Sequence, residues 1–279
     1  MSVAEGERRG SSATRIVLCL AAFVAFIVLF FGAIRTSAQI WAGISPEHLA
    51  LSQSVLIAKG HEHAGNLLAL LLVISTWLAW RTGRRFVFWL TAAAAIAALC
   101  ELLTGFLGPM QLTSLRTYTH VVCGHLTFAC IAGAAVILLT RTSPPVKVNS
   151  EFPVKELGGW IPVLVLIQVA MGSAYRHNFW SIMPHMAGAI VVAFLFVAEG
   201  VTLLQQVPDH RTLSLAAKSA IGIVIAQIAL GVTDFILRLL DFQTSPAWLL
   251  VSIAHVCIGS LTFATSICLA AAIRACVAD

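Results

Sequence analysis

The stretch His120-Val-Val-Cys-Gly-His-Leu-Thr-Phe-Ala129 occurs a second time in the chain, as His255-Val-Cys-Ile-Gly-Ser-Leu-Thr-Phe-Ala264. Seven of the ten positions are identical, and both copies lie inside long apolar segments. A histidine within a membrane helix costs free energy unless it has a partner, so a repeated one indicates a function. The repeat predicts a chain built from two related halves.

The composition indicates an integral membrane protein. Of the 279 residues 59% are hydrophobic and only 10% are charged, whereas soluble domains carry about 25% charged residues. Eight apolar stretches are long enough to cross about 30 Å of hydrocarbon. They lie near residues 15–35, 63–80, 86–108, 119–140, 158–175, 184–204, 213–237 and 248–273. We therefore predict an all-α protein with eight transmembrane helices.

The positive charges predict the orientation. With the N-terminus inside, 12 of the 17 lysines and arginines fall on the cytoplasmic side, so both termini are expected in the cytoplasm. The protein itself is expected in the cytoplasmic (inner) membrane. The net charge of +5 follows from this distribution and does not indicate nucleic-acid binding. The first apolar run, Ile16 to Ile34, exceeds the 7–15 residues of a signal peptide core and is predicted to be a retained helix.

Proline and polar residues divide the chain. Residues 1–14 are polar and predicted to form a disordered cytoplasmic tail. Residues 142–157 contain three prolines and read as a cytoplasmic linker. The linker separates a four-helix bundle at 15–141 from a second one at 158–275.

A smaller pattern supports the internal repeat. Glu101–Gly105, Gln168–Gly172 and Gln227–Gly231 each place a polar side chain four residues before a glycine, which puts both on one helix face. Glycine lets a neighbouring backbone or a flat ligand approach closely. The pattern is compatible with helix packing or with contact to a cofactor.

The histidines fall near the outer ends of the even-numbered predicted helices. The first half offers His61 or His63 together with His120, and the second half offers His185 together with His255. Two imidazoles from facing helices of a bundle form a bis-histidine haem site. We interpret these residues as haem ligands, with His61 the competitor of His63.

Other roles for the polar residues are less well supported. His125 lies five residues after His120, where the second copy has Ser260, and is interpreted as a neighbouring or access residue. Copper or zinc could also use His61-Glu-His63, although no thiolate or carboxylate cluster accompanies it. The seven cysteines lie in or beside apolar segments and predict neither a disulfide nor a zinc site.

With these residues the chain resembles the haem A synthase family over about residues 15–275. The resemblance rests on His120 and His255 in their helices, on Ser173-Ala-Tyr-Arg-His177 and on Met183-Pro-His185-Met-Ala-Gly188. It implies eight helices in two pseudo-repeated four-helix bundles, each with a histidine pair facing the outer side.

The resemblance also implies cofactors and a reaction. A structural haem b would be bound by His185 and His255, and the substrate haem O would lie between His63 (or His61) and His120. A haem methyl group would be oxidised to a formyl group, with water as the oxygen source. The implied partners are the haem O synthase (a farnesyltransferase), cytochrome oxidase assembly factors and an electron acceptor.

The catalytic carboxylate departs from the family's pattern. Family members read Glu-x-x-His-Arg at the start of the second helix, but here Gly60 stands three residues before His63 and Ala64 replaces the arginine. Glu62 is the nearest carboxylate and is the candidate catalytic residue. The alternatives are a diverged di-haem membrane cytochrome, a haem-handling assembly factor, or a transporter without a cofactor.

Overall fold

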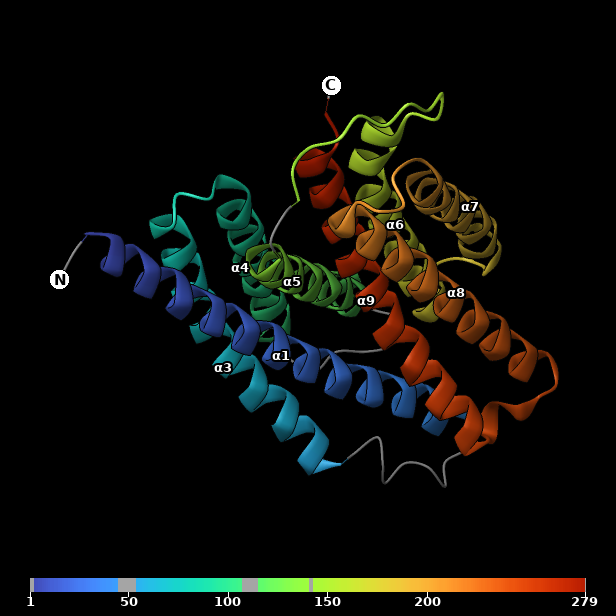
Figure 1. Cartoon of the computed structure of the whole chain (residues 1–279). Coiled ribbons are helices and arrows are strands. Elements are labelled where there is room, and N and C mark those ends of the chain that lie inside the picture. The colour runs from blue at the N-terminus through green and yellow to red at the C-terminus, as the bar shows by residue number, and fades with distance from the viewer. Residues whose placement is uncertain (1–2, 45–53, 107–114, 141–142, 279) are drawn as a thin grey trace.

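The computed structural model describes residues 3–44, 54–106, 115–140 and 143–278, and these residues are almost entirely helical (Figure 1). The long helices are α1 (Val3–Ile44), α3 (Val55–Arg81), α4 (Arg85–Phe106), α5 (Leu115–Leu139), α6 (Val154–Arg176), α7 (Met183–Gln206), α8 (Arg211–Leu239) and α9 (Pro246–Cys276), with a short 3₁₀ helix η2 (Phe242–Thr244) before α9. Within the described residues, eight helices are long and apolar enough to cross a membrane. The predicted all-α, eight-span membrane architecture is confirmed.

The helices α1 and α3 begin eight or more residues before their predicted apolar runs. The helix α1 starts at Val3, so residues predicted to be a disordered tail continue the first helix instead. Glutamate, alanine and arginine in this segment are good helix formers, and adding residues to an existing helix is easy. The helix α3 starts at Val55, where the Ser54 hydroxyl accepts a hydrogen bond from the Ile57 N–H. His61 therefore lies inside α3 rather than at its opening.

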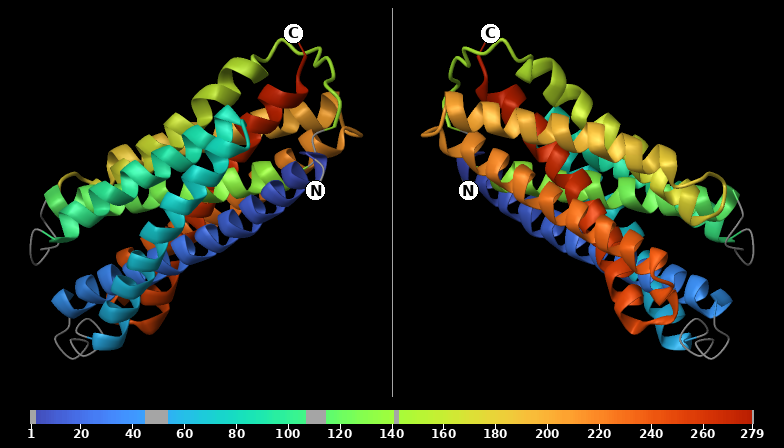
Figure 2. Two further views of the ribbon diagram at one scale, coloured as in Figure 1. Left: turned by 90° about the vertical axis from the view of Figure 1, so that its left-hand side faces the viewer. Right: turned by 90° about the vertical axis from the view of Figure 1, so that its right-hand side faces the viewer.

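The helices of each half contact one another in a closed ring. In the first half α1 and α4 each contact α3 and α5, and in the second half α6 and α8 each contact α7 and α9. The rings meet through α5 against α9, α1 against α9, and α5 against α6. Exchanging the halves maps these contacts onto themselves, which describes a pseudo-twofold arrangement. The start of α1 and the end of α9 lie at the same end of the protein (Figure 2).

The contact between α5 and α9 joins equivalent positions of the repeated motif. The Ser260 hydroxyl donates to the Val256 carbonyl (3.2 Å), which leaves its oxygen to accept a hydrogen bond from Nδ1–H of His125. His125 and Ser260 are both buried, so this bond lies inside the protein between the two halves. A Cβ at Gly133 would lie 2.9 Å from Ile267 Cγ2, so glycine allows the close approach of the helices here.

The connection between the halves is attached to the end of the chain. The Val146 N–H donates to the Cys276 carbonyl (2.8 Å), and the Ala278 N–H donates to the Val146 carbonyl (2.9 Å). The Ser143 N–H also donates to the Thr212 hydroxyl (3.0 Å). The connecting segment is therefore held against the second half.

Candidate histidine-pair sites

The structure brings together one pair of histidine rings in each half. The ring centroids of His61 and His120 are 6.0 Å apart with an interplanar angle of 61°, and those of His185 and His255 are 6.4 Å apart at 86°. Two imidazoles that bind one metal ion from opposite sides, at about 2.0–2.1 Å each, have centroids about 6 Å apart. Both separations therefore fit a metal held between the two rings.

In the first half the backbone fixes the protonation of the two rings. His61 Nδ1–H donates to the Val28 carbonyl (2.9 Å), and His120 Nδ1–H donates to the Glu101 carbonyl (3.1 Å). Since a carbonyl can only accept, each Nδ1 carries the proton and each Nε2 keeps its lone pair for a ligand. Metal-binding histidines commonly have this arrangement. His63 is exposed, so the geometry favours His61 over His63 as the partner of His120.

In the second half glycines make room for the rings. A Cβ at Gly172 would lie 2.9 Å from His185 Cε1, and a Cβ at Gly231 would lie 2.9 Å from His255 Cε1. His255 Nε2 accepts a hydrogen bond from the Gln227 amide (3.3 Å). The backbone of Gln168 lies beside the His185 ring and that of Gln227 beside the His255 ring, as the Glu101 carbonyl does for His120. Within the described residues, the side-chain oxygens of Gln168 and Gln227 are buried without a hydrogen-bond partner, and unsatisfied buried polar atoms of this kind suit a site that receives a ligand.

A fourth copy of the glycine pattern was not recognised in the sequence. Val28 and Gly32 in α1 have the same spacing, and a Cβ at Gly32 would lie 3.4 Å from His61 Cε1. Val28 contributes only its backbone carbonyl to the histidine. Because the other copies begin with a polar side chain, a valine in the first position gives no signal in the sequence.

The polar side chains of the pattern contact glycines on the histidine-bearing helices. Three such contacts occur, Glu101 with Gly124, Gln168 with Gly188, and Gln227 with Gly259. Glu101 Oε1 would be 2.9 Å from a Cβ at Gly124, four residues after His120. The Thr127 hydroxyl donates to Glu101 Oε2 (3.3 Å). Of the three polar residues only Glu101 can ionise, so the first half has a carboxyl group where the second has amides.

The candidate catalytic residue Glu62 does not face the site formed by His61 and His120. Its carboxylate pairs with Lys59 Nζ (2.7 Å), and 55% of its side chain is exposed. The sequence placed Glu62 as the nearest carboxylate to the site because it is adjacent to His61 and His63. A helix turns by about 100° per residue, which directs Glu62 away from the ring of His61. Glu101, on a different helix, contacts the His120 ring through its backbone carbonyl. Its carboxyl group lies against Gly124 and Thr127, one to two turns further along α5.

Each of the two sites offers two protein ligands, the two histidines of its pair. Within the described residues, no group of three or more histidine, cysteine, aspartate or glutamate side chains could hold a metal ion. Zinc and copper sites usually use three or four protein ligands, whereas a haem iron needs only axial ligands from the protein because the macrocycle supplies the others. The pairs therefore fit haem better than a bare ion.

Replacing Gly231 by alanine is expected to displace the His255 ring, because the new Cβ would lie 2.9 Å from its Cε1. Disturbing the support of a metal-binding histidine typically costs about 10- to 100-fold in affinity, so, for a haem held by this pair, we expect a comparable fall in affinity, measured by Soret titration. Gly222 in the same helix has nothing within 4 Å of its Cβ position, and Gly222→Ala is the matched control. Equal haem affinity in both variants would contradict the assignment of His255.

The chain matches no family model and no curated protein. The features of the chain that indicate a function are the two histidine pairs, the glycines that accommodate them, and the difference between Glu101 and Gln227.

Proposed function

We propose that the protein is a haem A synthase-like membrane enzyme that oxidises a methyl group of haem O to a formyl group for cytochrome oxidase assembly. The observation that supports it most is the presence of two imidazole pairs, at equivalent places in the two halves, with ring separations of 6.0 and 6.4 Å. His61 and His120 would hold the substrate haem O, and His185 and His255 would hold a haem b.

The two sites would divide the reaction. Haem supplies the redox chemistry when it is bound. Conversion of a methyl group to a formyl group with water removes four electrons and four protons. The Glu101 carboxyl group contacts Gly124, one turn along α5 from His120, and would accept protons that leave the substrate. Gln227, at the corresponding place in the second half, cannot do so, which suits a site that only relays electrons to an acceptor outside the chain.

The sites would face the outer side of the cytoplasmic membrane. All four histidines lie near the helix ends away from the termini, and the lysine and arginine distribution puts the termini in the cytoplasm. A haem O synthase would deliver the substrate, and cytochrome oxidase assembly factors would receive the product.

A diverged di-haem cytochrome or haem-handling factor is the second candidate. It is favoured because, with His61 as the ligand, Ala58 and Glu62 stand where the resembled family has glutamate and arginine. This candidate uses the same histidine pairs but makes no haem A.

The pyridine haemochrome spectrum of the full-length protein, purified after co-expression with a haem O synthase, distinguishes the candidates. We expect a haem A band together with haem B. Haem B alone would favour the diverged cytochrome, and a protein without haem would contradict both candidates.

A further inference from the structure

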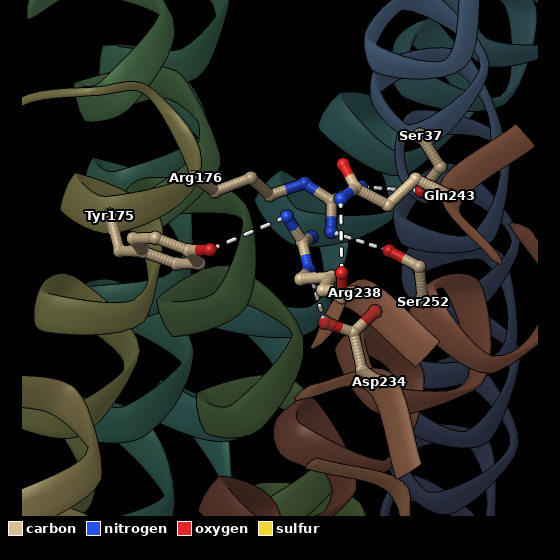
Figure 3. Close-up of polar contacts among 7 residues, drawn as sticks. All are labelled: Ser37, Tyr175, Arg176, Asp234, Arg238, Gln243 and Ser252. Carbon is tan, nitrogen blue, oxygen red and sulfur yellow. Dashed lines mark hydrogen bonds and ion pairs between the residues drawn. The ribbon is translucent and has the colours of Figure 1, made fainter. Parts of the chain in front are cut away.

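Seven polar residues from α1, α6, α8, η2 and α9 form a cluster (Figure 3). They are Ser37, Tyr175, Arg176, Asp234, Arg238, Gln243 and Ser252, here called the arginine cluster. Ser252 precedes His255 by three residues in α9, and Arg176 follows Gly172 by four residues in α6. Such offsets correspond to about 5–6 Å along a helix.

Arg176 reaches from α6 to two other helices. Its Nη1 donates to the Ser252 hydroxyl (3.0 Å) in α9, and its Nη2 donates to the Ser37 hydroxyl in α1. Neither serine carries a charge, and Arg176 forms no ion pair among the described residues. A partly buried guanidinium of this kind is stabilised when an anion binds beside it.

Arg238 makes more contacts with other side chains than Arg176 does. Its Nε donates to Asp234 Oδ2 (2.7 Å), its Nη1 lies 3.4 Å from the Tyr175 hydroxyl, and its guanidinium carbon lies 5.5 and 5.0 Å from the ring centroids of Tyr175 and Trp248. The side chains of Arg238 and Asp234 are only 20% and 15% exposed. Two arginines and one aspartate leave the cluster with one uncompensated positive charge.

Both arginines line one cavity. Its volume is about 210 Å³, and it is lined by Ile40, Tyr175, Arg176, Asn178 and Arg238. A water molecule occupies about 30 Å³, so the cavity has room for a carboxylate. Guanidinium groups bind carboxylates through two parallel hydrogen bonds, more strongly than they bind neutral acceptors.

We propose that this cavity binds a propionate carboxylate of the haem held by His185 and His255. The inference rests on the proposed haem site. It follows from the depth of the cluster, because Ser252 lies one turn from His255 and Arg176 lies one turn from Gly172, which contacts the His185 ring. Binding the carboxylate would compensate the charge of Arg176 and would fix which edge of the macrocycle points toward the cavity.

The test compares haem b with its dimethyl ester, in which both propionates are blocked. The full-length apoprotein carrying His120→Ala, so that only the second site is titrated, is reconstituted with each compound and followed by Soret absorbance. Hydrogen bonds to charged groups contribute enough that we expect haem b to bind roughly 10- to 100-fold more tightly than the ester. Arg176→Gln should reduce this preference to near one, whereas Arg274→Gln, at the opposite end of α9, should leave it unchanged.

Each other outcome has a separate meaning. If neither compound binds, the proposed haem site is contradicted. If both bind equally to the protein with Arg176 intact, the propionate assignment is overturned, and this comparison does not depend on the folding of any arginine variant. Loss of a co-purifying anionic phospholipid in Arg176→Gln, without loss of the haem preference, would show that the cavity binds a lipid phosphate and would also overturn it.

Discussion

Replacing His255 by alanine is expected to abolish stable haem binding in the second half. His255 and His185 face each other at 6.4 Å between ring centroids, so removal of one leaves a single imidazole. Loss of a hydrogen-bond partner of a metal-binding residue already costs about 10- to 100-fold in metal affinity. Loss of the metal-binding residue itself should cost at least as much. The measurement is the Soret absorbance per protein, combined with the low-spin signature of bis-histidine iron.

The first half supplies the matched controls for this prediction. His61→Ala should remove the first haem in the same way, because its ring pairs with that of His120. His63 lies two residues away and is exposed, so His63→Ala should leave both haems unchanged. A protein in which His63→Ala loses haem and His61→Ala retains it would contradict the assignment of His61.

Replacing Glu101 by glutamine is expected to stop haem A formation without removing either haem. Glutamine has nearly the same shape, and it already occupies the corresponding place in the second half as Gln227, so the helix contact with Gly124 should persist. General acid–base groups typically contribute about 10²- to 10⁴-fold to the rate. We expect a fall of that size in haem A formed, measured by chromatography of the extracted haems.

Two further variants make this prediction specific. Gln227→Glu adds a carboxyl group to the second half and should not restore haem A formation to the Glu101→Gln protein. Glu62→Gln changes an exposed residue paired with Lys59 and should have little effect. If Glu62→Gln stops the reaction while Glu101→Gln does not, the carboxyl role belongs to Glu62.

The sequence was sufficient to predict the eight helices, because each apolar run is as long as the membrane is thick. It was also sufficient to place histidines at similar depths in both halves, since the motif around His120 and His255 is repeated. It did not distinguish His61 from His63, because the start of α3 depends on the Ser54 cap, and the polar residues 59–63 separate the first turn of the helix from the long apolar run. His61 and His63 are only two residues apart, so the sequence alone did not show that they lie on different faces of α3.

Other features depend on contacts between distant segments. Val28 was missed because it acts through its carbonyl, which any residue possesses. Glu101 was recognised only as part of a packing pattern, because its neighbour His120 lies on another helix. The arginine cluster joins α1, α6, α8, η2 and α9, so no local stretch of sequence indicates that Arg176 and Arg238 border one cavity.

The hydrogen bond between His125 and Ser260 has an evolutionary consequence. In a symmetric homodimer of a four-helix ancestor, the residue at this position would face its own copy across the twofold axis. Two identical residues would then have to serve as both donor and acceptor. Fusion of two copies into one chain removes that requirement, so one position can become histidine and the other serine. The same freedom allows Glu101 to differ from Gln227, and it would let one ancestral site specialise in converting a haem while the other retains one.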